Sequence, residues 1–276
     1  MMIKEFLKYA FVAPLAAVAI ASATPASAQT TEGYWQKVQS AGVLRCGAAV
    51  SPPLVMRDPA SGNYSGAFSE MCREWAEVLG VKAEFVDTTW DNIVAGLQAG
   101  KWDISLSLNR TPTRAMAISF SISAMPYEIS LAYNKNNPKV PADAKSVADL
   151  DQAGVTMTVM SGTAQDKAIS AAVKNATILR LPGNDETRLA VISKRADILV
   201  DQSDTNLLFV QANPDWATQM TPTPALAKQG VAFGLPHGMS YSDIEAFNIF
   251  IQERLDTGHM DELLRKAADE VLQATK

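Results

Sequence analysis

The chain has 276 residues, 47% of them hydrophobic, and a formal net charge of −5. This length is enough for one large core or for two cores of ordinary domain size. The mild acidity, without any block of lysine and arginine, disfavours binding to nucleic acid or to anionic lipid. Beyond the N-terminal segment, no stretch of the sequence is long and apolar enough for a membrane span.

The N-terminal segment predicts export. Lys4 and Lys8 come first, an apolar run over 9–23 follows, and the small residues Ala26-Ser27-Ala28 come next. This is the order of a secretory signal peptide. We therefore expect cleavage after Ala28 and a periplasmic location. The alternative, an uncleaved amphipathic anchor, is disfavoured because the small-residue site follows the apolar run at the right distance.

The two cysteines are Cys46 and Cys72. An even count in an exported chain permits one disulfide. Cys46 lies in an apolar, strand-like run and Cys72 on the apolar stripe of the helix that follows. Two packed thiols are therefore an equally good interpretation, and the sequence leaves both open.

Strands and helices alternate in the first part of the chain. The predicted elements are a strand at 43–48, a helix from Phe68 to Leu79 ended by Gly80, a strand at 81–86, a helix capped by Asp91 and ended by Gly100, and a strand at 104–108. Apolar positions recur at helical spacing in the helices and alternate in the last strand. This order predicts a mostly parallel sheet flanked by helices.

The pattern starts again at Val155, after a polar segment with prolines at 138 and 141. The predicted elements are a strand at 155–159, a helix at 164–173, a strand at 177–181, a helix at 186–193 and a strand at 198–200. A proline-rich stretch, a strand at 230–235 and two helices complete the chain. The sequence therefore predicts two α/β units.

The loop after the strand at 104–108 suggests an anion site, because ligands of open parallel sheets bind beyond the carboxyl ends of the strands. Thr111 suits a helix N-cap and Pro112 the first helical residue. Arg114 then lies in the first turn, where a cation opposes the helix dipole. A bound carboxylate between its guanidinium and the free backbone N–H groups would resolve this conflict. The alternative is a surface arginine that pairs with a protein acid.

The second unit offers matching groups at two strand ends. Asp201 follows the apolar strand at 198–200 and could hold an ammonium group, or it could cap the helix near 203–210. Thr163, in the loop Ser161-Gly162-Thr163, could meet the same carboxylate as Arg114.

Motifs for other chemistry are missing from the sequence. No glycine-rich nucleotide loop and no nucleophile elbow occurs. The two histidines, His237 and His259, have no neighbouring cysteine or paired carboxylates. We therefore expect no metal, no cofactor and no catalytic residue.

Several short motifs occur in a characteristic order. They are Trp90-Asp91-Asn92-Ile93-Val94, Leu97-Gln98-Ala99-Gly100-Lys101-Trp102-Asp103, Thr111-Pro112-Thr113-Arg114-Ala115, Phe120-Ser121, Ser161-Gly162-Thr163 and Ala196-Asp197 to Asp201. In this order and spacing the chain resembles the periplasmic solute-binding proteins of polar amino-acid ABC importers, known as family 3. The resemblance covers nearly all of the mature chain.

This resemblance implies an α/β fold with two Rossmann-like lobes joined by two crossing hinge strands, the type II periplasmic-binding-protein architecture. The implied crossings lie near 129–133 and 231–234. The implied division is a signal peptide at 1–28, lobe I at 29–131 and 233–276, and lobe II at 132–232.

The resemblance also implies a ligand site. Arg114 would bind the α-carboxylate of an amino acid and Asp201 its α-ammonium group. The other implied contacts are Trp90, Ser107, Asn109 and Thr163, with the choice between Ser105 and Ser107 left open. Trp90 and Leu54 suggest an apolar or aromatic ligand side chain.

The implied function is a monomeric receptor that captures an amino acid or similar small carboxylate by cleft closure. It would deliver this ligand to the membrane permease of an ABC importer. One alternative is an exported dehydratase of the cyclohexadienyl or arogenate type on the same scaffold, for which Glu128 is a conceivable acid or base. Another is a sensor that presents its ligand-bound state to a membrane receptor.

Overall fold

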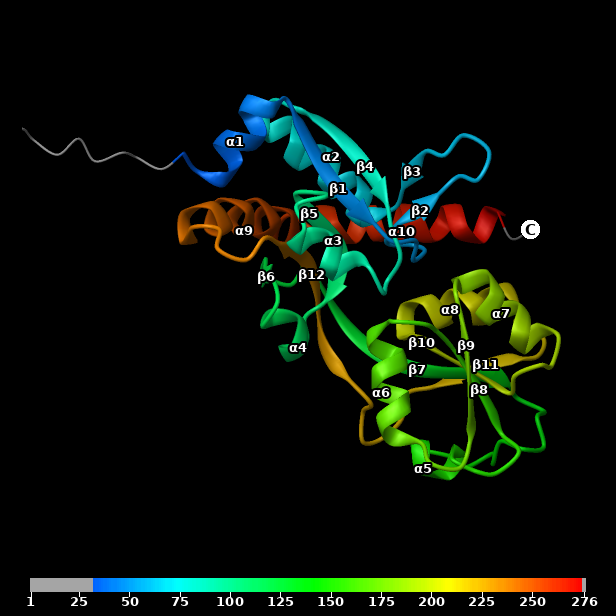
Figure 1. Ribbon diagram of the computed structural model, residues 1–276. Helices are drawn as coiled ribbons and strands as arrows, with labels where there is room; N and C mark the ends of the chain where they lie inside the picture. The colour runs from blue at the N-terminus through cyan, green and yellow to red at the C-terminus, as the bar shows by residue number, and fades with distance from the viewer. Residues whose placement is uncertain (1–31, 275–276) are drawn as a thin grey trace, which may run out of the picture. The chain divides into compact units, whose positions relative to one another are not determined.

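The computed structural model describes residues 32–274, so the predicted signal peptide lies outside the described residues (Figure 1). Ten strands form one sheet in the order β4-β1-β5-β12-β7-β10-β8-β9, with β6 beside β12 and β11 beside β7. The strands are β1 Val43–Ala48, β2 Met56–Arg57, β3 Tyr64–Ser65, β4 Lys82–Asp87, β5 Ile104–Asn109, β6 Ser119–Phe120, β7 Met125–Asn134, β8 Thr156–Met160, β9 Thr177–Leu181, β10 Ile198–Gln202, β11 Ala217–Met220 and β12 Lys228–Leu235. The helices are α1 Tyr34–Ala41, α2 Ala67–Leu79, α3 Ile93–Gln98, α4 Pro112–Ala115, α5 Val147–Leu150, α6 Ala164–Ala172, α7 Asn184–Ile192, α8 Ser203–Ala212, α9 Tyr241–Asp256 and α10 His259–Ala274.

Lobe I is built on β4, β1 and β5, which run parallel, with β12 antiparallel to β5. Helix α2 covers this sheet and ends at Gly80, which adopts the left-handed conformation expected of a C-cap. From the C-terminal part of the chain, Phe247 on α9 packs its ring against Trp35, Trp75 and Phe233. Lobe I therefore combines the first part of the described chain with its last helices.

Lobe II is built on β9, β8 and β10, which run parallel, with β7 antiparallel to β10 and β11 beside β7. Helices α6, α7 and α8 contact these strands. Both lobes are thus α/β layers with mostly parallel strands, as the alternating pattern predicts. The carboxyl ends of β8, β9 and β10 lie at one edge of the lobe II sheet.

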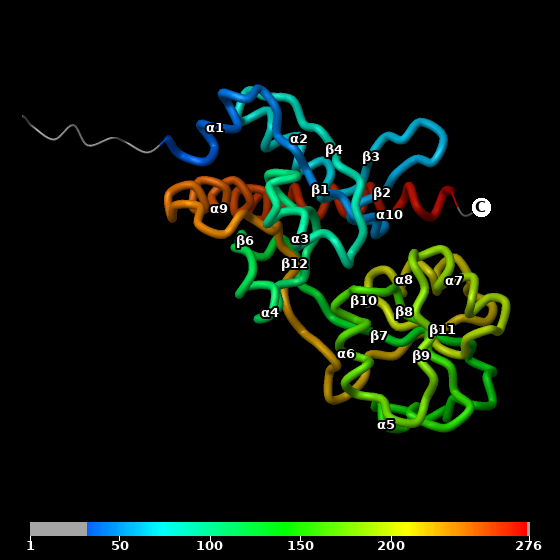
Figure 2. The backbone as a smooth tube through the Cα atoms, viewed as in Figure 1, coloured from blue at the N-terminus to red at the C-terminus, as the bar shows by residue number. Residues whose placement is uncertain are grey.

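Two long strands belong to both lobes, as the smooth backbone in Figure 2 shows. The first residues of β7 pair antiparallel with β12, whereas Ile129 to Tyr133 pair with β10. The crossings that the resemblance implies, near 129–133 and 231–234, pair with β10 and β5 respectively, and the two strands pair with each other in the adjacent segments 125–128 and 228–231. Each strand is one continuous run of residues, and its sequence does not mark where its partner changes.

A disulfide joins β1 to α2 in lobe I. The structure pairs Cys46 with Cys72 across a Cα–Cα distance of 6.8 Å, and both side chains are buried. The bond ties the first strand to the helix that covers it.

The start of α3 differs from the prediction. Its N-cap is Asn92 rather than Asp91, and the Asn92 side chain makes no capping hydrogen bond. Asp91 is exposed. Its carboxylate lies against Gly162 of lobe II instead, a contact between segments far apart in sequence that helix propensity cannot reveal.

Candidate ligand-binding site

Arg114 lies where the sequence predicts, in a turn that begins with the predicted cap. Thr111 Oγ1 accepts a hydrogen bond from the Arg114 backbone N–H at 3.3 Å, and Pro112 is the first residue of α4. However, α4 has only four residues. One turn carries little dipole, so the anion prediction cannot rest on the start of this helix.

Burial is what distinguishes Arg114. Its side chain is 6% exposed, and within residues 32–274 its guanidinium donates one hydrogen bond, to the Asn109 carbonyl at 3.3 Å. No acid of the described chain forms an ion pair with it, so the alternative of a surface arginine paired with a protein acid is wrong. Burial lowers the pKa of Arg114. A buried guanidinium with unused donors is a site for an anion.

Asp201 is the complementary group in lobe II. It is 5% exposed and accepts hydrogen bonds from Gln165 Nε2 at 2.7 Å and from the Gln202 backbone N–H at 2.8 Å. It does not cap α8, whose N-cap is Gln202. Burial raises the pKa of Asp201 more than its neighbours lower it, and no lysine or arginine in the described range forms an ion pair with it. This carboxylate is therefore available to a cation.

Tyr127 and Gln165 connect the two charged groups. The Tyr127 hydroxyl donates to Gln165 Oε1 at 3.0 Å, and Gln165 in turn donates to Asp201. Burial raises the pKa of Tyr127; the charge of Asp201 also raises it and the charge of Arg114 lowers it. Tyr127 is thus near both charges, which places the lobe I cation and the lobe II anion around one region.

Tyr127 and Gln165 are not among the contacts predicted from the sequence. Gln165 stands two positions after Thr163, so the strand-end loop was the signal that could have found it. Tyr127 lies in β7, the shared strand, and nothing local marks it as a site residue.

The two serines of β5 have different environments. Ser105 Oγ accepts from Trp102 Nε1 at 2.7 Å and donates to the Ile93 carbonyl at 3.3 Å. Ser107 Oγ is buried and has no hydrogen-bond partner among the described residues. Ser107 also has a φ of +51°, a conformation that costs a non-glycine residue about 1–3 kcal/mol. Of the two, Ser107 therefore has the free hydroxyl that a ligand could use.

Ser105 is held in place by the Trp102 indole, which is wedged between Gly47 and Gly96. The Trp102 indole fills the space that side chains at Gly47 and Gly96 would occupy, because a Cβ built at either glycine overlaps its ring. The indole is 2% exposed. This packing aims its N–H at Ser105 and keeps that serine in the core of lobe I.

The other three predicted contacts, Thr163, Asn109 and Trp90, differ in which of their polar groups already have hydrogen-bond partners. Thr163 caps α6: its hydroxyl donates to the Met160 carbonyl at 2.8 Å and accepts from the Asp166 N–H at 3.2 Å. This leaves the Thr163 backbone N–H, rather than its hydroxyl proton, for a ligand. Asn109 is buried at the end of β5.

Trp90 is half-buried. Its ring packs on an apolar cluster of lobe I that includes Ile93 and Leu108, and its Nε1 donates to the Val50 carbonyl at 3.4 Å. Trp90 therefore has a packing role in addition to any contact with a ligand.

The two lobes touch next to Trp90. Gly162 has a φ of +75°, and a Cβ at this position would overlap Asp91 Oδ1. The loop that precedes α6 therefore lies directly against lobe I, and a glycine is needed there for both backbone conformation and space.

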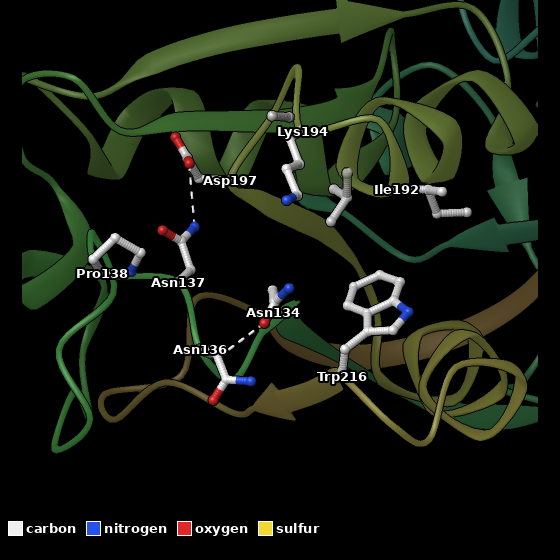
Figure 3. Close-up of a pocket in the computed structure, with 10 residues that line it drawn as sticks. Asn134, Asn136, Asn137, Pro138, Ile192, Lys194, Asp197 and Trp216 are labelled. Atoms are coloured by element: carbon white, nitrogen blue, oxygen red, sulfur yellow. Dashed lines mark hydrogen bonds between the residues drawn. The ribbon is translucent and has the colours of Figure 1, made fainter.

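A separate pocket of about 310 Å³ lies in lobe II and includes Asn134, Lys194 and Trp216 (Figure 3). None of the predicted ligand-binding residues lines it. Asp197 does, but Asn137 donates to it at 3.1 Å, Lys139 at 3.0 Å and the Thr156 N–H at 2.9 Å. Burial would raise the pKa of Asp197, yet these hydrogen bonds and the charge of Lys139 lower it.

Residues 32–274 contain no group of three histidine, cysteine, aspartate or glutamate side chains close enough to hold a metal ion. In this range no helix has the length and apolarity that crossing a membrane requires.

Comparison with known proteins gives one family and several relatives. The family model of the bacterial extracellular solute-binding proteins, family 3, matches residues 44–274. A cyclohexadienyl dehydratase from Pseudomonas aeruginosa is 24% identical over 255 residues, which cover 90% of this chain and 89% of the relative. A probable histidine-binding protein from Campylobacter jejuni is 26% identical over 73% of this chain and 76% of its own length.

A solved structure is similar over nearly its whole length. It is an ancestral amino-acid-binding protein described as a precursor of cyclohexadienyl dehydratase, with a TM-score of 0.75 and 27% identity. The match covers 84% of this chain and 98% of that one.

Proposed function

Because the chain belongs to the bacterial extracellular solute-binding proteins, family 3, we propose that it captures an amino acid or similar small carboxylate in the periplasm and delivers it to an ABC-type permease. The observation that carries this proposal is a pair of buried, opposite charges, Arg114 on lobe I and Asp201 on lobe II, neither of which forms an ion pair among the described residues. A zwitterion supplies the two partners that the described chain does not.

Lobe I binds the carboxylate in this mechanism. The unused Arg114 donors form a bidentate contact with it, and the free Ser107 hydroxyl adds a further donor. The guanidinium is already out of water, so its desolvation cost has been met before the ligand arrives. The ligand carboxylate then gains most of the interaction energy.

Lobe II binds the ammonium group. Asp201 accepts from it, while Gln165 and Tyr127 hold the carboxylate in position through the hydrogen-bonded chain described above. Closure brings the Gly162 loop against Asp91 and excludes water from the two ion pairs, which strengthens them. The closed form is then the state that a permease recognises.

Calorimetry on the mature protein tests this mechanism, with a panel of the common amino acids and related carboxylates. We expect a ligand to bind, and Arg114→Ala or Asp201→Asn to weaken its binding at least about 30-fold, because removal of one partner from a buried charge pair costs about 2–5 kcal/mol. Arg110→Ala is the matched control, since Arg110 lies in the same loop but is exposed. No binding across the panel, or unchanged affinity in Arg114→Ala, contradicts the mechanism.

Delivery to a permease needs a separate test. We expect the wild-type gene, but not the Arg114→Ala variant, to restore solute uptake in a strain from which it has been deleted. Normal uptake in the deletion strain, combined with a lost transcriptional or chemotactic response to the ligand, would instead identify a sensor.

The second candidate is a dehydratase, favoured by the 24% identity to the Pseudomonas enzyme. It requires an acid or base in the site, and Glu128 does not suit this role. Tyr127 faces the charged cluster, so the next side chain along β7 projects to the other face, where Glu128 lies 3.8 Å from Lys228. Incubation of the protein with prephenate and arogenate should therefore give no aromatic product, and turnover would establish the enzyme instead.

A further inference from the structure

Two polar residues of α7 face the same edge of lobe II as Asp201. Asn184 begins the helix and Arg188 stands one turn later, so the two side chains share one face. Helical side chains lean toward the N-terminus of their helix. Because α7 follows β9 and contacts β8 and β10, this lean carries the Arg188 guanidinium toward the carboxyl ends of the strands.

Both residues have buried polar atoms without partners. Asn184 is 6% exposed, and neither its Nδ2 nor its Oδ1 has a hydrogen-bond partner among residues 32–274. In Arg188 the same is true of Nε and Nη2. A buried polar group left unsatisfied costs about 1–3 kcal/mol, so these four atoms together are an expensive arrangement unless a ligand completes it.

Arg188 also borders a cavity of about 750 Å³ between the lobes. Val50 and Pro52 line it from lobe I, and Leu208 and Phe209 line it from α8. Trp90 donates to the carbonyl of Val50, which lines this cavity, whereas Trp90, Arg114 and Asp201 themselves do not line it. The charge of Arg188 also lowers the pKa of Asp201, which places this cation near the proposed ammonium site.

We propose that Arg188 and Asn184 bind a second carboxylate, on the ligand's side chain, and that the ligand is therefore a dicarboxylic amino acid. This inference rests on the function proposed above. Arg114 then matches the α-carboxylate, Asp201 the ammonium group and Arg188 the distal carboxylate. An apolar side chain would leave the Arg188 donors unsatisfied, and a basic side chain would be repelled by its charge.

This conclusion replaces the apolar ligand that Leu54 and Trp90 suggest in the sequence. Leu54 is 2% exposed and packs in the core of lobe I. Leu54 therefore has almost no exposed surface for contact with a ligand. The Trp90 ring can pack against the methylene groups of a dicarboxylic side chain as well as against an apolar side chain.

The test is calorimetry on the full mature protein with glutamate, aspartate, glutamine, leucine, histidine and arginine. We expect one of the two dicarboxylates to bind tightest. Arg188→Gln should weaken its binding at least about tenfold and leave glutamine nearly unaffected, because an amide can replace the lost ionic contact only for a neutral partner. Asn184→Ala should act in the same direction with a smaller loss, and the exposed Arg195→Gln is the matched control.

Two results would overturn this assignment. One is tightest binding of a basic or apolar amino acid; the other is an Arg188→Gln protein with the same dicarboxylate preference as the wild type. Failure of the proposed function looks different, because then no amino acid binds and Arg114→Ala has no effect either. Thermal unfolding of each variant without ligand confirms that a change in affinity does not reflect loss of the fold.

Discussion

Two carboxylates at opposite ends of β10 have contrasting partners. Asp197 precedes the strand and is bound by Lys139, Asn137 and a backbone N–H of β8, whereas Asp201 near its end has only two amide donors. Asp103 of lobe I repeats the first arrangement, since Arg45 lies 2.7 Å from it and also donates its backbone N–H at 2.8 Å. Asp197 and Asp103 each form an ion pair with a cation of their own lobe. Asp201 forms no ion pair among the described residues, and Arg188 acts on it only through its charge.

The largest expected effect is on the stability of the ligand-free protein. Asp197→Asn should lower the free energy of unfolding by about 1–3 kcal/mol, because charged hydrogen bonds are lost and Lys139 loses its partner. Asp201→Asn should leave it unchanged or raise it, because a desolvated charge is removed. Urea unfolding measures both, with the exposed Asp215→Asn as control. Equal destabilisation by the two substitutions would show that Asp201 is a structural acid as well.

A smaller effect is expected in the pH dependence of stability. The pKa of Asp197 is lowered in the folded state, so its contribution is present above the unfolded value of 3.8 and is lost as the pH falls through the folded pKa. The pKa of Asp201 is raised above 3.8, so the folded state binds its proton more tightly and this residue costs stability as the pH rises through that range. Any stability gained in Asp201→Asn should therefore disappear at low pH. A gain that stays constant with pH would mean that Asp201 does not titrate with a raised pKa.

The smallest effect concerns the contact between the lobes. Gly162→Ala should weaken ligand binding about fivefold, because its Cβ overlaps Asp91 and opposes closure. Gly154→Ala carries a similar backbone penalty, about 1–2 kcal/mol, at a φ of +87°, but it has no atom within 4 Å of the new Cβ. It should therefore lower stability without an effect on affinity. The double variant Asp91→Ala with Gly162→Ala should recover the steric part of the loss, and the contact is unimportant for closure if Gly162→Ala binds ligand as the wild type does.

Much of this fold follows from local patterns. The alternation of strands and helices, the stop at Gly80 and the Thr111-Pro112 helix start depend on neighbouring residues, and the structure contains all of them. Arg114 and Asp201 were predicted as ligand contacts because polar residues after buried strands meet at the edge of a parallel sheet, and the structure buries both. All of these features depend on the position of a residue along the chain, which the sequence provides directly.

The details that depend on distant partners could not be predicted. Trp102 uses the Ser105 hydroxyl and leaves that of Ser107 without a partner among the described residues, a difference that the sequence does not show. Arg188 is one of several arginines in the sequence, and only the fold shows that its donors are buried without acceptors. The helix dipole is weak support for an anion at Arg114, since its helix is a single turn, and the burial of the guanidinium is visible only in the fold.

The wedge of Trp102 between Gly47 and Gly96 limits how this protein can evolve. A larger residue at either glycine is unfavourable while the indole is present, and loss of the indole first leaves a cavity and frees the Ser105 hydroxyl. We therefore expect a larger residue at either glycine to be tolerated only together with a smaller side chain at position 102. A substitution of Arg188 does not require a compensating change elsewhere, because its Nε and Nη2 have no partner in the described chain. Substitutions on this face of α7 should accordingly be tolerated more readily than substitutions in the packing beneath β5.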